Sequence, residues 1–231
     1  MQPVSNLYNS IIAGEHWNET KLIVDGVEYD ESKIFSLRTS IALMENGPTI
    51  GKAISAECDA EILLPEEKPS RMAEIRPYVR VCNNTQQSEW IPQGIYYIDT
   101  REESHNGVGF ESLKIHGYDA MMRAGQDYAD TSLTFPATDY DVVVEIANKI
   151  GVQPDPTLIA DIAEFYQIPL PTGYTMREVL GYIGAMYAGN FIITDQGKLR
   201  FIGLADLPPD SRYLTDEGGN TILFGGDRIV L

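Results

Sequence analysis

The stretch that decides the fold is residues 53–62, which read AISAECDAEI. Its side chains alternate between two sets, the first being Ile54, Ala56, Cys58, Ala60 and Ile62 and the second Ser55, Glu57, Asp59 and Glu61. Because the first set is small or apolar and the second is polar, this period of two predicts a β-strand with one buried face and one face in water. Cys58 falls on the buried face, so we expect it to pack as a small core residue and not to act as a reactive thiol.

Further strands are predicted on both sides of this one. Residues 35–41 alternate in the same way, with Phe35, Leu37, Thr39 and Ile41 on one face. Strand-like runs also cover 21–24, 78–82, 95–100 and 110–116, and turn-forming residues separate them at 25–26, 46–48, 83–84 and 106–107. About seven short strands bounded by such turns predict an antiparallel barrel or sandwich.

The second half of the chain changes to helical spacing. Thr138 precedes an acidic and apolar run that stops at Gly151, and residues 175–178 have the form of a capping box, so helices are expected over 138–150 and 175–189. A β-hairpin is expected over 191–202. The predicted fold class is α+β, with a barrel- or sandwich-like antiparallel β-domain over residues 1–128, a small helix–helix–hairpin module over 129–205 and connecting strands over 206–231. The apolar run at 229–231 predicts that a further β-domain follows in a longer protein.

The net negative charge of the chain argues against polyanionic binding partners. The chain has 17 Lys and Arg against 34 Asp and Glu, a formal net charge of −17. Nucleic acids and anionic membranes attract clustered Lys and Arg, and the sequence has no such cluster. The first twenty residues lack the pattern of a signal peptide, and two cysteines are too few for a disulfide scaffold. We therefore expect synthesis in a reducing cytoplasm and binding to neither DNA nor membrane.

Residue types that carry catalysis are scattered along the chain. The three histidines, His16, His105 and His116, do not have metal-binding spacing. Residues 47–53 resemble a phosphate-binding loop, but only three residues separate the glycines, and Ala53 stands where the loop needs Ser or Thr. We predict no catalytic residues, no metal site and no cofactor, and a protein that is not an enzyme.

Aromatic residues indicate surfaces for assembly. The chain has 13 Tyr, 7 Phe and 2 Trp, and rigid aromatic rings are enriched at protein interfaces. The candidate interface residues are Trp17, Trp90, Tyr96 and Tyr97.

Three segments, taken in order, resemble a known family. Residues 90–99 (WIPQGIYYID), residues 117–122 (GYDAMM) and the helix and hairpin of 175–202 are similar to parts of bacteriophage tail proteins of the baseplate hub family, also called tail-associated or late-control-type proteins. The likeness covers roughly residues 20–205, in the family's order. It implies a trimer at the tail tip of the virion, in which β-domains form a ring that continues the tail tube and contacts other tail components, such as the distal tail and tube proteins.

A ring of this kind implies a lumen through which DNA passes without being bound. A carboxylate-rich lining would repel phosphates and let the genome slide. The polar face of the strand over residues 53–62 supplies the candidate lining, Glu57, Asp59 and Glu61.

Two alternatives to a structural role in the tail stay open from the sequence. One is a carbohydrate- or host-receptor-binding module in which Trp17, Trp90 and Tyr96 stack on sugar rings. The other is part of a tail-associated cell-wall hydrolase with dispersed carboxylates, for which Asp99 is the candidate acid.

Overall fold

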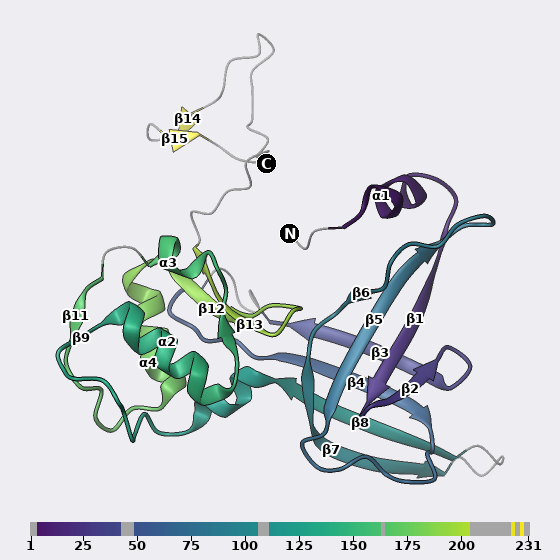
Figure 1. Ribbon diagram of the computed structural model, residues 1–231, viewed down its shortest axis with the longest axis horizontal. Coiled ribbons are helices and arrows are strands. Elements are labelled where there is room, and N and C mark those ends of the chain that lie inside the picture. The colour runs from purple at the N-terminus through teal and green to yellow at the C-terminus, as the bar shows by residue number, and fades with distance from the viewer. Residues whose placement is uncertain are drawn as a thin grey trace.

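The computed structural model describes residues 4–42, 49–105, 111–162 and 165–203, together with the backbone of Leu223–Phe224 and Asp227–Arg228. The chain folds into two adjoining lobes (Figure 1). The first is a curled antiparallel sheet, and the second packs helices against small sheets. This architecture confirms the predicted α+β fold class.

The helices and strands fall into three groups along the chain. Those of the first lobe are α1 (Asn6–Ile12), β1 (Trp17–Val24), β2 (Val27–Asp30), β3 (Ile34–Ile41), β4 (Ala56–Leu63), β5 (Glu74–Cys82), β6 (Ile91–Pro92), β7 (Tyr96–His105) and β8 (Glu111–Asp119). Those of the second lobe are the 3-10 helix η1 (Ala120–Gly125), β9 (Ala137–Thr138), α2 (Asp139–Ile150), β10 (Gln153–Pro154), α3 (Leu158–Asp161), β11 (Gln167–Ile168), α4 (Met176–Met186), β12 (Gly189–Ile193) and β13 (Lys198–Gly203). Last come β14 (Leu223–Phe224) and β15 (Asp227–Arg228), which pair with each other. The rest of the predicted connecting region over 206–231 lies outside the described residues.

The sheet of the first lobe turns a corner at β5. Its strand order is β2-β1-β5-β7-β8-β4-β3, with β6 on β5, and every pairing is antiparallel. β5 pairs with β1 from Ile75 to Cys82 but with β7 only through Glu74 and Ile75. The two halves of the sheet therefore cross, as Figure 1 shows, and enclose a core between them, as in packed-sheet folds.

β4 has the predicted two-faced character. Cys58, Ala60 and Ile62 are at most 4% exposed, whereas Asp59 is exposed. Burial raises the pKa of the Cys58 thiol to about 12, so Cys58 is a core residue as predicted. The strand begins at Ala56, and Ile54 precedes it.

The neighbouring strand β3 differs from the prediction. Phe35 is 48% exposed and Ile41 is 36% exposed, so the expectation that they share a buried face is wrong. β3 is the last strand of the sheet path and pairs only with β4 among the described strands. Its register shifts between Ile34 and Ser36, and such an irregularity turns the intervening side chain away from its regular face.

The two predicted turns that lie within the described residues are present in the structure. Asp25 and Gly26 both have positive φ, 52° and 80°, the geometry of a type I′ hairpin turn. At 83–84, Asn83 Oδ1 accepts hydrogen bonds from the amides of Thr85 and Gln86. The predicted turns at 46–48 and 106–107 lie outside the described residues. Helix α1 and strand β2 were not predicted.

The second lobe follows its predicted capping signals. Thr138 Oγ1 accepts from the amide of Asp141 to begin α2, and Gly151 ends it with a φ of 82°. Thr175 and Glu178 exchange the two hydrogen bonds of a capping box at the start of α4. The expected hairpin is β12–β13.

Each of the two lobes has its own hydrophobic core, and some residues from the first 128 positions belong to the core of the second lobe. The first core contains Leu22, Cys58, Ile75 and Ile115 among its members, and the second contains the buried faces of α2, α4 and β12. Ala53 and residues of η1 belong to the second core, although they lie within the 1–128 range. The predicted domain division at residue 128 stays a prediction.

Candidate functional site

The polar face of β4, predicted to line a lumen, carries charges of both signs. In the sheet register, Asp59 lies between Arg38 of β3 and His116 of β8, and Glu61 lies opposite Lys114. Directly opposed side chains of neighbouring strands point to the same side of a sheet and lie within contact distance. The carboxylates of β4 are therefore partly compensated by basic groups on the adjacent strands.

Hydrogen bonds hold these carboxylates in place. His116 Nδ1 and Asp59 Oδ1 lie 2.8 Å apart, and Ser112 Oγ donates to Glu61 Oε1 over 2.6 Å. A shallow hollow of about 280 Å³ opens over Asp59, Glu61, Lys114 and Glu102. The surface is a mixed charge ladder with more carboxylates than permanent cations.

The four aromatic residues predicted to form an interface lie in different environments in the structure. Trp17 is 47% exposed at the start of β1, whereas Tyr96 is 4% exposed and its Oη donates to the carbonyl of Gln93. Tyr97 is half-buried and lies against the second core, with the Arg123 guanidinium 4.0 Å from its ring centre. The prediction of Tyr96 as an interface residue is wrong, because the inward face of β7 places its ring in the first core.

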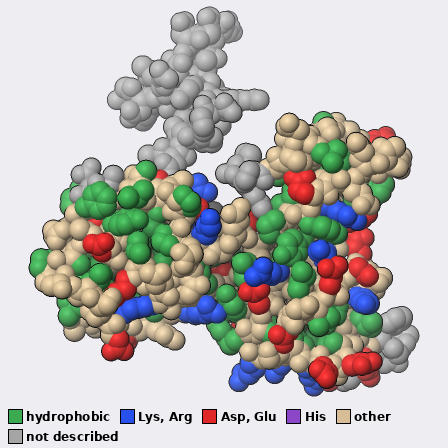
Figure 2. Space-filling model, in the orientation of Figure 1, with side chains coloured by type: hydrophobic (Ala, Val, Ile, Leu, Met, Phe, Trp, Pro, Cys, Tyr) green, Lys and Arg blue, Asp and Glu red, His purple; other side chains and the backbone are tan. Residues whose placement is uncertain are grey.

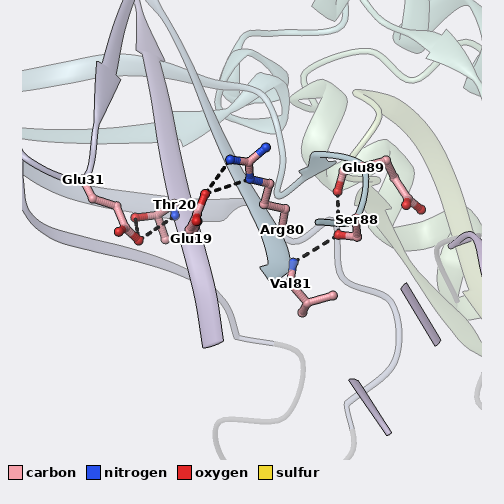
Figure 3. Close-up of polar contacts among 7 residues, drawn as sticks. All are labelled: Glu19, Thr20, Glu31, Arg80, Val81, Ser88 and Glu89. Carbon is pink, nitrogen blue, oxygen red and sulfur yellow. Dashed lines mark hydrogen bonds and ion pairs between the residues drawn. The ribbon is translucent and has the colours of Figure 1, made fainter. Parts of the chain in front are cut away.

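Trp90 is half-buried among cations on the outer face of β1 and β5. Lys21 Nζ lies 4.8 Å and Arg80 Cζ 4.4 Å from its ring centre. Arg80 also donates to Glu19 Oε2 (Figure 3), with a distance of 2.9 Å from its Nε. Because Tyr96 is buried and two cations cover the Trp90 ring, Trp17, Trp90 and Tyr96 do not form the expected sugar-stacking platform.

The same corner of the first lobe is braced by short polar contacts. Ser88 Oγ donates to the carbonyl of Glu89 and accepts from the amide of Val81, and Glu31 accepts from the Thr20 amide at 2.9 Å (Figure 3). These contacts fix the loop before β6 and the segment after β2 on β1 and β5. They explain the local structure without a ligand.

A buried carboxylate lies where the two lobes meet. Asp119 ends β8, is 2% exposed, and accepts hydrogen bonds from Ser55 Oγ and from the amides of Ala56 and Met121. Burial raises its pKa to about 6, although these hydrogen bonds oppose the shift. Asp119 was not among the residues predicted from the sequence; its position after an apolar strand and before a short helix is the signal of an N-cap.

Asp119 lies at the base of a cleft between the lobes. The cleft has a volume of about 600 Å³ and is also lined by Asp155, Asp195, Lys198 and Arg200. Burial raises the pKa of Asp155, but hydrogen bonds from Thr157, together with the weaker effects of the Arg200 and Lys198 charges, lower it overall. The Asp155 carboxylate accepts hydrogen bonds from the Thr157 amide and hydroxyl, which accounts for its presence without a ligand.

The other candidate chemical groups do not converge. Asp99 is exposed at the irregularity between Ile98 and Thr100 on β7. In the part of the chain that the structure describes, no three His, Cys, Asp or Glu side chains are grouped as metal ligands. Within the same residues, no helix has the length and apolar character needed to cross a membrane.

Exposed apolar side chains occur on both lobes, and Figure 2 shows hydrophobic side chains on each of them. Those of the second lobe are Ile159, Phe165, Tyr166, Leu170, Tyr174, Tyr182 and Met186, all between 41% and 58% exposed. Among them, the rings of Tyr174 and Tyr182 are in contact, with 5.4 Å between their centres. Single exposed apolar residues are ordinary on protein surfaces.

The comparisons with known proteins rest on structure alone, because no family model and no curated protein matches the chain. The fold is similar to that of two solved tail proteins. The 43 kDa tail protein of prophage MuSo2 from Shewanella oneidensis superposes with a TM-score of 0.58 at 13% identity, over 86% of this chain and 59% of that one. The tail protein from Neisseria meningitidis MC58 superposes with a TM-score of 0.51 at 16% identity, over 88% of this chain and 58% of that one. The chain thus spans less than two thirds of either protein, and at these identities the likeness shows a common fold.

Proposed function

We propose that this protein is a structural, non-enzymatic component of a phage or prophage tail, located in the virion at the tail tip as part of the baseplate hub. The observation that carries the proposal is the superposition of both lobes, 86% of the chain, on a prophage tail protein. The ordered sequence resemblance over roughly residues 20–205 points to the same kind of protein.

We further propose that the subunit assembles as a trimeric ring that continues the tail tube and contacts the distal tail and tube proteins. The two-lobed fold supports this, because the curled sheet provides a rigid wall and both lobes carry exposed apolar residues. Subunits related by rotation need such self-complementary or partner-directed surfaces to close a ring.

The polar face of β4 is the proposed lumen lining. Glu57, Asp59, Glu61 and Glu102 outnumber the permanent cations Arg38 and Lys114 on the opposed strands. A surface with this excess repels phosphate, and the contacts of Ser112 with Glu61 and of His116 with Asp59 hold these carboxylates in place. DNA would then pass the ring without binding to it.

The ring is tested by light scattering and negative-stain microscopy of the chain over a range of concentrations, with deletion of its gene in the encoding phage. We expect trimers with a central opening, and particles that lack complete tails. A chain that stays monomeric at every concentration and whose loss leaves infectious, fully tailed particles would refute the proposal.

The lining is tested separately with the charge-reversed variant Glu57→Lys, Asp59→Lys, Glu61→Lys. We expect assembled particles that eject DNA more slowly. The matched control is Glu66→Lys, Glu67→Lys, which changes exposed carboxylates in the loop after β4. Equal ejection rates in the two variants would remove the lumen assignment and leave the structural role intact.

A further inference from the structure

Among the described residues, the chain passes between the two lobes at two adjacent places. Residues 49–54 pair with β12 of the second lobe, and the chain then enters β4 of the first lobe at Ala56. It returns where β8 ends at Asp119 and η1 begins at Ala120 (Figure 1). The lobes have separate hydrophobic cores, and units of this kind turn relative to each other unless a large apolar interface joins them. The two crossings are therefore the place for a hinge, because hinges are a few residues at the ends of elements.

One carboxylate holds both crossings together. Asp119 is 2% exposed, and its Oδ1 accepts from Ser55 Oγ at 2.8 Å and from the Met121 amide at 3.0 Å. Its Oδ2 accepts from the Ala56 amide at 2.8 Å. The ladder between β4 and β8 stops one pair before Ala56 and Asp119, so these side-chain bonds continue the link between the crossings beyond the end of the ladder.

Side chains from the two lobes also meet at other places. The Arg123 guanidinium of η1 lies 4.0 Å from the centre of the Tyr97 ring of β7, and a Cβ on Gly197 would lie 2.9 Å from Ile95 Cδ1. Packing contacts of this kind are not directional, whereas hydrogen bonds are, so the three bonds of Asp119 define the angle between the lobes more closely. The cleft of about 600 Å³ is lined by both lobes and by Asp119, so its width depends on that angle.

The charged form of this carboxylate is costly while it is buried. Burial raises the pKa of Asp119 to about 6, although its hydrogen bonds and the charge of Arg177 on α4 oppose the shift. Exposure to water removes the cost of burial and returns the pKa toward its ordinary value. The other titratable groups that line the same cleft are Tyr96 of β7, Asp155 before α3, Asp195 of the β12–β13 turn, and Lys198 and Arg200 of β13.

We propose that the Asp119 carboxylate is a latch between the lobes, which holds them together when it is neutral and lets them turn apart, widening the cleft, when it is charged. The neutral acid still accepts through its carbonyl oxygen and can donate its proton to Ser55 Oγ. The charged form gains hydration on opening, so deprotonation favours the open arrangement. With a pKa of 3.8 when open and about 6 when closed, the ratio of open to closed molecules rises about tenfold between pH 5 and pH 8. This inference goes beyond the proposed role in the tail and does not depend on it.

The test measures the distance between spin labels on the two lobes of the full chain, by double electron–electron resonance at pH 5 and pH 8. The labels are attached at Asn84→Cys in the first lobe and Asn148→Cys on α2, both exposed positions, since the native Cys58 and Cys82 are buried. We expect two distances at pH 8, and the population of the second relative to the first should fall about tenfold at pH 5. The matched pair within the first lobe, Asn84→Cys with Glu67→Cys, should keep one distance at both pH values.

Asp119→Asn removes the titrating group, so its distances should be the same at pH 5 and pH 8. Ser55→Ala tests the latch without changing the carboxylate: it removes a bond that the charged form accepts, so the open population should rise severalfold at pH 8 and by less at pH 5. Its control is Ser40→Ala, which lines the same cleft and is not a donor to Asp119. The proposal is overturned by a single distance at both pH values in the native chain, or by an Asp119→Asn protein that keeps the pH dependence. An equal change in the matched pair within the first lobe, or equal behaviour of Ser55→Ala and Ser40→Ala, would overturn it as well.

Discussion

Replacing Asn190 by alanine should loosen the segment over residues 49–54. Asn190 is 6% exposed, and its side chain makes two hydrogen bonds to that segment. Its Oδ1 accepts from the Lys52 amide at 2.9 Å, and its Nδ2 donates to the Thr49 carbonyl at 2.7 Å. Each bond contributes about 1 kcal/mol net, and the stranded partners lose part of their solvation as well. We expect the free energy of unfolding to fall by about 2–3 kcal/mol.

Two measurements check this prediction at different scales. Urea unfolding gives the global change, and amide hydrogen exchange reports the segment itself, where protection of Lys52 is expected to fall about 100-fold. Gln196→Ala, in the exposed turn of the same hairpin, is the control and should change stability by less than about 0.5 kcal/mol. If Asn190→Ala matches that control in both measurements, the reasoning about this bridge is wrong.

Three further perturbations test the polar and close-packed sites. Asp119→Asn should change the pH dependence of stability: because the pKa of Asp119 is raised to about 6, this group contributes a loss of about 2–3 kcal/mol to the free energy of unfolding as pH rises from 4 to 7, and an equal slope for the variant and the native protein in urea unfolding would contradict this. Burial raises the pKa of Glu145, but hydrogen bonds, first from Tyr128, outweigh it. Its stabilisation is therefore present above pH 4.5 and lost below, so Glu145→Gln should unfold at lower temperature than the native protein at pH 7 and the difference should shrink at pH 3. Gly181→Ala should lower the melting temperature because its Cβ meets the Gly51 carbonyl, whereas Gly125→Ala, with no atom within 4 Å, should not.

Local signals in the sequence predicted much of the fold. The alternation around Cys58 gave β4, and Thr138, Gly151 and Thr175 marked helix ends that the structure has at those residues. Such features depend on side chains a few positions apart, so they can be identified before any tertiary contact is known. Helix α1 was missed because its seven residues have no acidic first turn and contain a single buried side chain.

The surfaces were harder to predict because they depend on which strands become neighbours. The carboxylates of β4 read as an acidic face, yet Arg38 and Lys114 reach the same face from β3 and β8. Tyr96 was predicted to be exposed and is buried, whereas Phe35 was predicted to be buried and is exposed. The same alternation of side chains gives different burial on the central strand β7 and on the terminal strand β3. The hollow between α4 and residues 49–54 is lined by residues more than a hundred positions apart in the sequence, so no short-range pattern predicts it.

The parallel bridge between Ala53 and Phe191 has a consequence for how the chain is made. Residues 49–54 leave the ribosome long before β12 is synthesised. During translation this segment, which is joined to the first lobe, therefore has no β12 to pair with. An excised fragment of residues 129–203 would contain β12 but lack residues 49–54, so the backbone edge of Phe191 would be exposed to pairing with other chains. Severing the polypeptide near residue 128 and mixing the halves should therefore restore the native second lobe by complementation, and neither half should achieve it alone.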